Sequence, residues 1–412
     1  MSVGAERRAV PGRWAATAAG AGLLGADGVP RPTIFAEMTQ LAHRTGAINL
    51  GQGYPDADGP TEVLEAAVAA IRGGRNQYAP GPGVAELRRA VAAHQDRCYG
   101  IALDPDTDVL VTTGATEAIA ASVLALTEPG DEVVVLEPFY DAYAAVVALA
   151  GAVRRTVPLR PPAGPGERWR LDPQDLAAAV GPRTRLILLN TPHNPTGTVL
   201  TAAELAAVAD AATAVGAVVV TDEVYEHLTY DDARHVPIAT LPGMAERTLT
   251  ISSAGKTFSV TGWKVGWVTG PAPLVDAVRA VKQFLTYTSG APLQPAVALA
   301  LGLHDAVAEL RRSLEERRDL LCAGLEAAGL EVSRPEGTYF AIADAAALGW
   351  EDAVAFCAAL PERAGVVAIP VTAFTTPGGP AATRMRSLVR FAFCRSRSDI
   401  ERAAAQLAAA RW

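Results

Sequence analysis

Short apolar runs rich in valine, isoleucine and leucine recur along the chain between longer segments rich in alanine and leucine. The runs are "DVLVTT" at 108–113, "EVVVLE" from Glu132, "RLILLN" ending at Asn190, "AVVVTDE" from Ala217 and "RTLTIS" from Arg247. Continuous short apolar runs are typical of strands buried on both faces of a parallel sheet, and the segments between them can form crossover helices. The pattern predicts an α/β fold, with a mostly parallel sheet between two layers of helices.

The chain beyond Pro271 follows a different pattern. A helical segment is expected up to about Tyr287, and the charged stretch 310–319 predicts a long surface helix. Strand-like "TYFAIA", "GVVAIP" and "SLVRFAF" then alternate with helices, which indicates a smaller α+β domain packed against the N-terminal segment. The predicted division is a flexible leader at 1–30, an N-terminal segment of the small domain at 31–60, a large domain at 61–305 and a small domain at 306–412.

Charge and cysteine content narrow the possible partners. The 412 residues carry a net charge of -8, which argues against a general nucleic-acid or membrane-surface binder because both need clustered positive charge. The four cysteines lie far apart without a CxxC pair, and the histidines show no metal-ligand spacing, so no protein metal site is expected. The leader's apolar run is interrupted by glycine and is a weak signal peptide, so a cytoplasmic protein that acts on small molecules is predicted.

Distinctive polar loops follow the five predicted strands. In chain order they are "GATEA", "EPFYD", "NTPHNPTG", "DEVY" and "SSAGK". Parallel strands end at one edge of a sheet, and ligands bind beyond that edge, where the loops leave for the helices. The loops therefore predict one shared ligand site.

Lys256 is the candidate nucleophile of that site. It lies in a loop of small residues, and burial or a nearby cation would lower its pKa and expose an amine suited to a Schiff base. Lone loop lysines are usually solvated, but Ser253 and Lys264 add the hydroxyl and second cation that a phosphate dianion would bind. In "GATEA", Ala115 and Thr116 offer a helix N-terminus for a phosphate, although Thr116 could equally be a structural N-cap.

Four further polar or charged residues are candidates for contact with the same ligand. Asp222 ends an aliphatic run, so it either pairs with a cation such as a protonated ring nitrogen or caps the next helix. Tyr225 follows one helical turn later, and Asn194 is held between two prolines in "TPHNPTG". Arg390 interrupts an apolar strand, where either a ligand carboxylate or an internal ion pair would satisfy it.

As a set, the motifs resemble the class I/II aminotransferases, pyridoxal-phosphate enzymes of the aspartate aminotransferase fold. The resemblance covers the chain from about Pro32 and rests on "INLGQGYPDADGP", "NQYAPGPG", "EPFYDAY", "HNPTG", "TDEVYEHL" and "SSAGKTFSVTGWKVGW". These runs are most similar to the branch of kynurenine/glutamine, methionine and actinobacterial N-succinyldiaminopimelate aminotransferases. "IFAEM", "GATEAIAA" and "ALPERAGVVAIP" bring the chain closest to the last of these.

The resemblance also implies a role for each candidate residue. Lys256 would form the Schiff base with pyridoxal 5'-phosphate and then carry the substrate proton, and Asp222 would pair with the ring nitrogen. Asn194 and Tyr225 would bind the ring's 3-oxygen, and Tyr140 would stack on its face. The phosphate would be held by Ala115, Thr116, Ser253 and Lys264, with Tyr78 reaching in from a neighbouring subunit. Arg390 and the backbone of Gly53 would bind the substrate α-carboxylate.

The activity that follows from the resemblance is that of a homodimeric aminotransferase. An L-amino acid, with glutamate expected, would give its amino group to a 2-oxo acid in a ping-pong exchange. The acceptor could be N-succinyl-2-amino-6-oxopimelate of lysine and diaminopimelate biosynthesis. A kynurenine-, glutamine- or methionine-type aminotransferase, a carbon–sulfur β-lyase and an oxidase of specialised metabolism are the alternatives, because these enzymes differ in the side-chain pocket rather than in the cofactor anchors.

Overall fold

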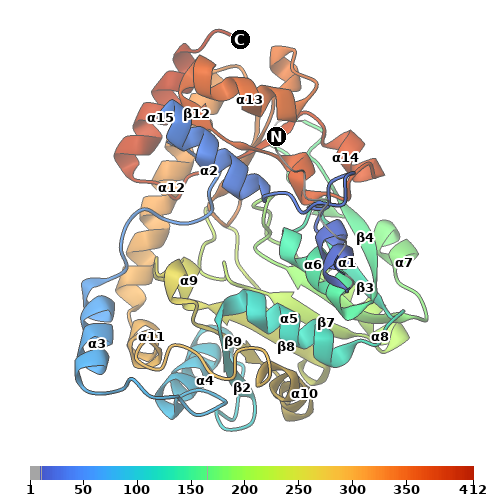
Figure 1. Ribbon diagram of the computed structural model, residues 1–412, viewed down its shortest axis with the longest axis vertical. Helices are drawn as coiled ribbons and strands as arrows, with labels where there is room; N and C mark the ends of the chain where they lie inside the picture. Colours follow the sequence, from blue (N-terminus) through green and yellow to red (C-terminus); the bar gives the residue numbers. More distant parts are fainter. Residues whose placement is uncertain (1–9, 11, 165) are drawn as a thin grey trace, which may run out of the picture.

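An eight-stranded sheet forms the centre of the larger part of the molecule in the computed structural model, which describes residues 10, 12–164 and 166–412 (Figure 1). The strand order is β2-β9-β8-β7-β6-β3-β4-β5. The strands are β2 (Val109–Thr112), β3 (Glu132–Glu137), β4 (Val153–Arg160), β5 (Arg170–Leu171), β6 (Thr184–Asn190), β7 (Val218–Asp222), β8 (Thr248–Ser253) and β9 (Gly266–Thr269). The five predicted strands are therefore confirmed as β2, β3, β6, β7 and β8.

The strand directions bring the predicted loops to one edge of the sheet. Strands β8, β7, β6, β3 and β4 pair in parallel. Strand β9 is antiparallel to both of its neighbours, β2 and β8, so β2 runs in the same direction as the parallel set. The carboxyl ends of all five predicted strands therefore lie together, as the sequence predicts.

Helices cover both faces of this sheet, which confirms the three-layer α/β prediction. Val133 and Val135 of β3 pack in one core with residues of α5, α6 and α10, whereas Val134 and Leu136 pack in another with residues of α7 and α8. This alternation is the two-residue period of a strand that is buried on both faces. The helices of this part are α3 (Thr61–Arg72), α4 (Ala85–Tyr99), α5 (Gly114–Leu126), α6 (Asp141–Ala150), α7 (Pro173–Ala179), α8 (Ala202–Val215), α9 (Ala254–Thr257), α10 (Ala272–Lys282) and α11 (Gln294–Ala300).

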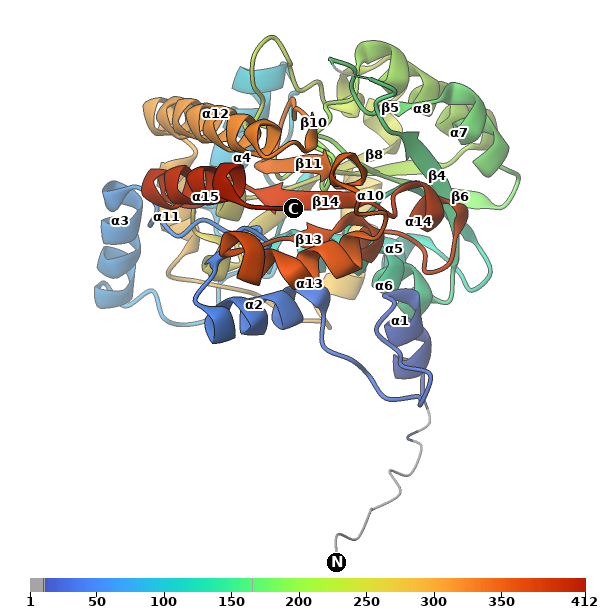
Figure 2. The same cartoon turned by 90° about the horizontal axis from the view of Figure 1, so that it is seen from above.

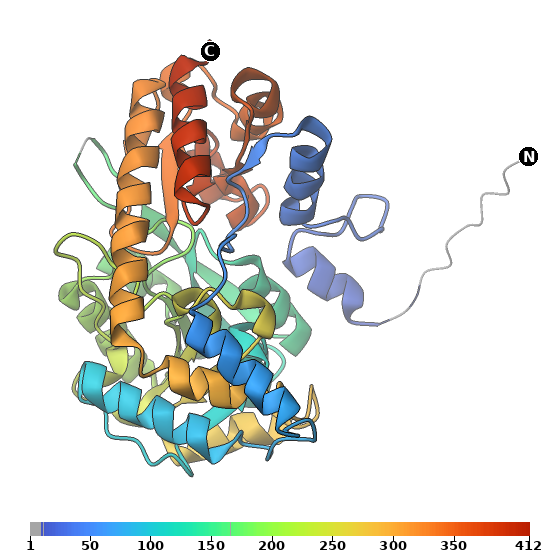
Figure 3. The ribbon, with the colours of Figure 1, turned by 90° about the vertical axis from the view of Figure 1, so that its left-hand side faces the viewer.

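A second, four-stranded sheet of order β10-β11-β14-β13 lies in the C-terminal part of the chain. Its strands are β10 (Glu331–Ser333), β11 (Phe340–Asp344), β13 (Ile369–Pro370) and β14 (Leu388–Ala392), and its helices are α12 (His304–Ala327), α13 (Ala353–Ala364), α14 (Pro380–Arg384) and α15 (Arg397–Ala409). Figure 3 shows α12 and α15 side by side. The N-terminal segment joins this part, because β1 (Ile48–Asn49) pairs in parallel with β12 (Val366–Val367). The exact domain boundaries stay a prediction.

The flexible leader that the sequence predicts at 1–30 stays a prediction, and its residues 1–9 and 11 lie outside the described residues. Its described part forms α1 (Trp14–Gly20), which packs beside α6 (Figures 1 and 2). The packing is close because a Cβ on Gly20 would lie only 2.7 Å from the Cβ of Ala148. Arg13 donates a hydrogen bond to the carbonyl of Leu149 on α6, and Arg154 donates one to the carbonyl of Gly20. Helix α2 (Ile34–Thr45) follows and is capped by Thr33.

Among the residues that the structure describes, no helix is both long and apolar enough to cross a membrane.

Candidate active site

A pocket of about 280 Å³ lies where the strands of the large sheet end, between this edge and the C-terminal part. It is lined by Gly53, Ala115, Thr116, Tyr140, Asn194, Asp222, Tyr225, Ser253, Lys256, Lys264 and Arg390, which are all the predicted site residues except Tyr78. Tyr78 is 81% exposed, and its ring contacts the edge of the Tyr287 ring at a centroid distance of 5.2 Å. Its predicted contact with a neighbouring subunit stays a prediction.

Lys256 lies in the single turn of α9, directly after β8. Its Nζ donates a hydrogen bond of 3.0 Å to the carbonyl of Gly53, which also accepts one of 2.6 Å from the hydroxyl of Tyr339. Burial of the amine lowers the pKa of Lys256 from 10.5 to about 8. A substantial fraction of this lysine is therefore a neutral amine at mildly alkaline pH, which is the form that attacks a carbonyl carbon.

Asp222 is the last residue of β7 and is buried at the pocket. Burial raises the pKa of its carboxyl to about 6, although the Tyr143 hydroxyl favours the charged form by donating a 2.6 Å hydrogen bond to Oδ2. The residues after Asp222 form turns rather than a helix, so the helix-cap alternative is wrong. A buried carboxylate of this kind is stabilised by a cationic ligand group, and Tyr225 lies in the same turn.

The N-terminus of α5 forms one end of the pocket. Its N-cap residue is Thr113, so the alternative that Thr116 caps the helix is wrong. Lys264 approaches this helix end so closely that a Cβ on Gly114 would lie 3.2 Å from its Nζ. Lys264 also holds a left-handed backbone with φ of 54°, which costs a non-glycine residue about 1 kcal/mol or more and is often found at functional sites.

Gly266 of β9 allows this end of the pocket to form. A Cβ at this position would lie 2.7 Å from the carbonyl carbon of Gly114 and 2.9 Å from the backbone nitrogen of Ala115. Only glycine lets the first turn of α5 approach the strand so closely. Free backbone N–H groups, the hydroxyl of Ser253 and the ammonium of Lys264 thus surround one space, and this set of donors suits a phosphate.

Arg390 of β14 supplies a buried positive charge to the pocket lining. Its hydrogen bonds go to neutral oxygens, the Asn194 side chain at 3.0 Å and the Gly51 carbonyl at 2.7 Å. Its Nε is buried and has no hydrogen-bond partner among the residues that the structure describes, and the guanidinium lies 4.0 Å from the centre of the Phe340 ring. The internal ion pair that the sequence allowed finds no acidic partner in the described part of the chain, so a ligand carboxylate is the arrangement that fits.

Sequence reasoning did not single out several residues of the pocket. Tyr143 lies one helical turn after Tyr140 in "EPFYDAY", and this spacing was the only signal that could have revealed it. Asn190 accepts a hydrogen bond from the backbone of Asn194 and so fixes the "HNPTG" loop. Other lining residues that were not predicted are Phe35, Gln52, Tyr54, Ile119, Val224, Gly255, Thr261, Val265 and Phe340.

Comparisons with known proteins agree with this geometry. The family model for aminotransferase class I and II matches residues 45–407, which is most of the chain. This chain is a class I and II aminotransferase. The family predicted from the sequence is therefore confirmed, and so is the prediction that the protein is a transaminase.

Individual relatives match the aminotransferase over nearly its full length. It is 57% identical over 380 residues to a probable N-succinyldiaminopimelate aminotransferase of Mycobacterium tuberculosis, covering 91% of this chain and 95% of that protein. It is 40% identical to the methionine aminotransferase of Escherichia coli, covering 91% and 95%. The solved structure of N-succinyldiaminopimelate aminotransferase from Mycobacterium tuberculosis superposes with a TM-score of 0.90 at 55% identity, covering 97% of this chain and 99% of that one.

Proposed function

We propose that the pocket binds pyridoxal 5'-phosphate and that the residues around it have the roles that the family resemblance implies. The observation that carries the proposal is the convergence of Lys256, Asp222, Lys264 and Arg390 on one pocket from three separate segments of the chain, since the two lysines share the connection between β8 and β9. Each of these groups needs a partner that the cofactor or its substrate would supply. The donors around α5 suit the phosphate, the buried Asp222 suits a protonated ring nitrogen, and the unpartnered Nε of Arg390 suits a carboxylate.

Around the ring, Asn194 and Tyr225 would donate to its 3-oxygen, and Tyr140 would stack on its face. Tyr140 and Tyr143 meet edge to face at 5.7 Å, and Tyr143 in turn holds Asp222. Tyr140 would thus fix the plane of the cofactor ring, and Tyr143 would fix the Asp222 carboxylate at the edge of that ring. When bound, the cofactor supplies an electron sink for the substrate's α-carbon.

The protein's own groups would handle the proton. With a pKa near 8, Lys256 can both accept and return a proton close to neutral pH, as a general acid/base requires. The ammonium is held by the Gly53 carbonyl and lies 5.5 Å from the Tyr339 ring centre, so its position is fixed by two segments. Arg390 would orient the substrate by its α-carboxylate, which places the α-carbon proton within reach of the lysine.

For the substrates we propose glutamate as amino donor and an N-succinylated amino-oxopimelate as acceptor, in lysine and diaminopimelate biosynthesis. The support is the higher identity to the probable N-succinyldiaminopimelate aminotransferase, 57% against 40% for the methionine enzyme. A half-reaction assay tests this proposal. The cofactor-loaded protein is mixed with glutamate, N-succinyldiaminopimelate, methionine or kynurenine, and the loss of the cofactor's visible absorption band is followed, with Lys256→Ala as the control.

The expected result is fast loss of the band with glutamate and N-succinyldiaminopimelate and slower loss with methionine and kynurenine. Faster reaction with methionine or kynurenine would refute the substrate proposal but leave the cofactor proposal intact. A cysteine S-conjugate tests the lyase alternative, because its conversion to pyruvate, ammonia and a thiol without an acceptor would indicate β-elimination. A Lys256→Ala protein that still turned over at the wild-type rate would refute the assignment of the lysine.

A homodimer is proposed as the active form. Tyr78, Phe284 and Tyr287 are 81%, 84% and 53% exposed, and Tyr78 packs on Tyr287, so large apolar side chains gather on the surface near Tyr78. Burial against a second copy would cover these side chains and could bring Tyr78 to the partner's phosphate site. Ultracentrifugation with an activity assay tests this, because a monomeric variant with full turnover would contradict it.

A further inference from the structure

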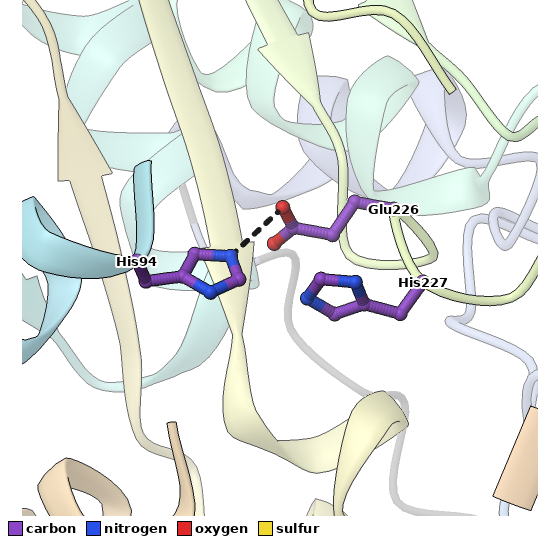
Figure 4. A group of neighbouring side chains, drawn as sticks. All are labelled: His94, Glu226 and His227. Carbon is purple, nitrogen blue, oxygen red and sulfur yellow. Dashed lines mark hydrogen bonds and ion pairs between the residues drawn. The ribbon is translucent and has the colours of Figure 1, made fainter. Parts of the chain in front are cut away.

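A buried cluster of charged and polar side chains lies next to the pocket but outside its lining. Glu226 and His94 point at each other, with Nε2 to Oε2 at 3.3 Å, and the His227 ring lies beside them (Figure 4). His94 belongs to α4, and Glu226 follows β7. Neither residue is predicted by the sequence to have a role.

The residues after β7 alternate between the pocket and this cluster. Asp222 and Tyr225 line the pocket, whereas Glu223 and Glu226 are fully or almost fully buried outside it. Each of these two glutamates pairs with a histidine from another segment, Glu223 with His235 at 2.8 Å and Glu226 with His94. A buried carboxylate is tolerated only when it is paired and hydrogen-bonded, so these ion pairs fix the conformation of the turn.

The two glutamates differ in the strand to which they bind. Glu223 accepts a hydrogen bond from Thr221 of β7, the strand that Glu223 directly follows. Glu226 instead accepts one of 2.7 Å from Ser252 of β8, which directly precedes the pocket residue Ser253. Glu226 therefore connects two different chain segments that both contribute to the pocket.

Helix α4 completes the connection. Tyr99 at its end donates a 2.8 Å hydrogen bond to Oε2 of Glu226, the same oxygen that His94 contacts. Burial disfavours the charged form of His94, but the Glu226 carboxylate outweighs this and raises the pKa of the ring to about 10. His94 is thus an imidazolium at neutral pH, and burial lowers the pKa of His227 to about 4.

We propose that Glu226 is a positioning residue, which with His94 holds the turn that carries Tyr225 at a fixed distance from the strand end that carries Ser253. This inference rests on the proposed function, in which Tyr225 binds the ring oxygen and Ser253 the phosphate of one cofactor. A rigid ligand that is held at both ends requires the two protein segments to keep a fixed spacing. Glu226 connects the turn and the strand end by a hydrogen bond to Ser252 that lies outside the pocket lining.

A metal site is the rival interpretation of this cluster. The ligand atoms of His94, Glu226 and His227 all lie within 4.8 Å of one another, and histidine and carboxylate ligands suit a divalent transition metal. The contacts of Glu226 favour the ion pair. Both oxygens of Glu226 already accept hydrogen bonds, from Ser252 on one and from Tyr99 and His94 on the other. A protonated His94 would also have to lose its proton before it could bind a metal.

Paired hydroxyl deletions give the sharpest test, because neither hydroxyl lines the pocket. Ser252→Ala removes the hydroxyl that binds Glu226, and Thr221→Val is the matched control that removes the hydroxyl bound to Glu223. The measurements are the dissociation constant of pyridoxal 5'-phosphate, the pH midpoint of its visible absorption band, and thermal melting without cofactor. Ser252→Ala should weaken cofactor binding by about tenfold, because a hydrogen bond to a charged group is lost. It should also shift the pH midpoint of the cofactor's visible absorption band. Thr221→Val should leave binding within about twofold.

A role in stability alone would lower the melting temperature of both variants and move neither the dissociation constant nor the midpoint, and that result would overturn the proposal. Glu226→Gln and the double variant His94→Gln/Glu226→Gln extend the test, with larger effects expected in the single variant because it leaves the buried His94 ring without its carboxylate partner. Zinc bound stoichiometrically by wild type and lost in Glu226→Gln would overturn the proposal in favour of a metal site. A wild-type protein that did not bind pyridoxal 5'-phosphate would instead refute the proposed function itself.

Discussion

The hydrogen bond from Tyr143 to Asp222 allows a quantitative prediction. Tyr143→Phe removes the hydroxyl that lies 2.6 Å from Oδ2 and keeps the ring. Burial already raises the pKa of Asp222 to about 6, and the hydroxyl opposes this by stabilising the carboxylate. A hydrogen bond to a charged group contributes about 1.5–3 kcal/mol. Because one pKa unit corresponds to about 1.4 kcal/mol, its loss should raise the pKa of Asp222 by about 1–2 pH units.

Cofactor binding to the apo-protein is the assay. The ionised Asp222 would pair with the protonated ring nitrogen, so affinity should increase as the pH rises through the pKa of this carboxyl. The midpoint of that increase should lie near pH 6 in wild type and about 1–2 pH units higher in Tyr143→Phe. Tyr140→Phe is the control, since it keeps a stacking ring and leaves the bond to Asp222 in place. An unchanged midpoint in Tyr143→Phe would refute the reasoning.

Three further predictions concern the carboxylate site, the phosphate site and the buried ion pair. Arg390→Gln should lower kcat/KM for the amino donor by about 100-fold or more, because two charge-assisted hydrogen bonds to the substrate are lost. Steady-state kinetics measure this loss, and a clearly smaller one would contradict the role of Arg390. Gly266→Ala should lower the free energy of unfolding by about 1–3 kcal/mol and weaken cofactor binding, as measured by thermal melting and by titration with the cofactor. Gly262→Ala is the control, because no described atom lies within 4 Å of its added Cβ, and it should change neither stability nor binding. The pKa of His94 is raised from 6.5 to about 10, so its stabilising effect is complete below about pH 6.5 and lost as the pH rises toward 10. Melting curves of His94→Gln across that range should therefore fall less with pH than those of wild type, and parallel curves would contradict the assignment.

The fold could be predicted where the physical signal is local. A strand buried on both faces needs a continuous apolar run, so β2, β3, β6, β7 and β8 could each be read from a few neighbouring residues. Strand β9 was missed because it is only four residues long, "GWVT", and its first two residues end a motif that was interpreted chemically. Helix α1 was missed because alanine and glycine give it no clear apolar stripe, and its docking depends on α6.

The residues that can perform the chemistry could be found from the amino-acid chain alone. Lys256, Asp222, Lys264 and Arg390 are unusual in their own local surroundings, because each is a charge beside an apolar run or in a loop of small residues. The rule that parallel strands end at one edge then placed Asp222 and Lys256 in one site, to which the family resemblance added Arg390. That reasoning needs only the chain and the direction of its strands.

The groups that hold those residues in place became visible only in the folded chain. Tyr143 reaches Asp222 across 79 positions, Tyr339 reaches Gly53 across 286, and His94 reaches Glu226 across 132. Such contacts leave no spacing in the sequence, since they depend on how α4, α6 and the C-terminal part pack against the sheet. The charge and reactivity of the site are local properties of the chain, whereas its precision comes from partners that only folding brings together.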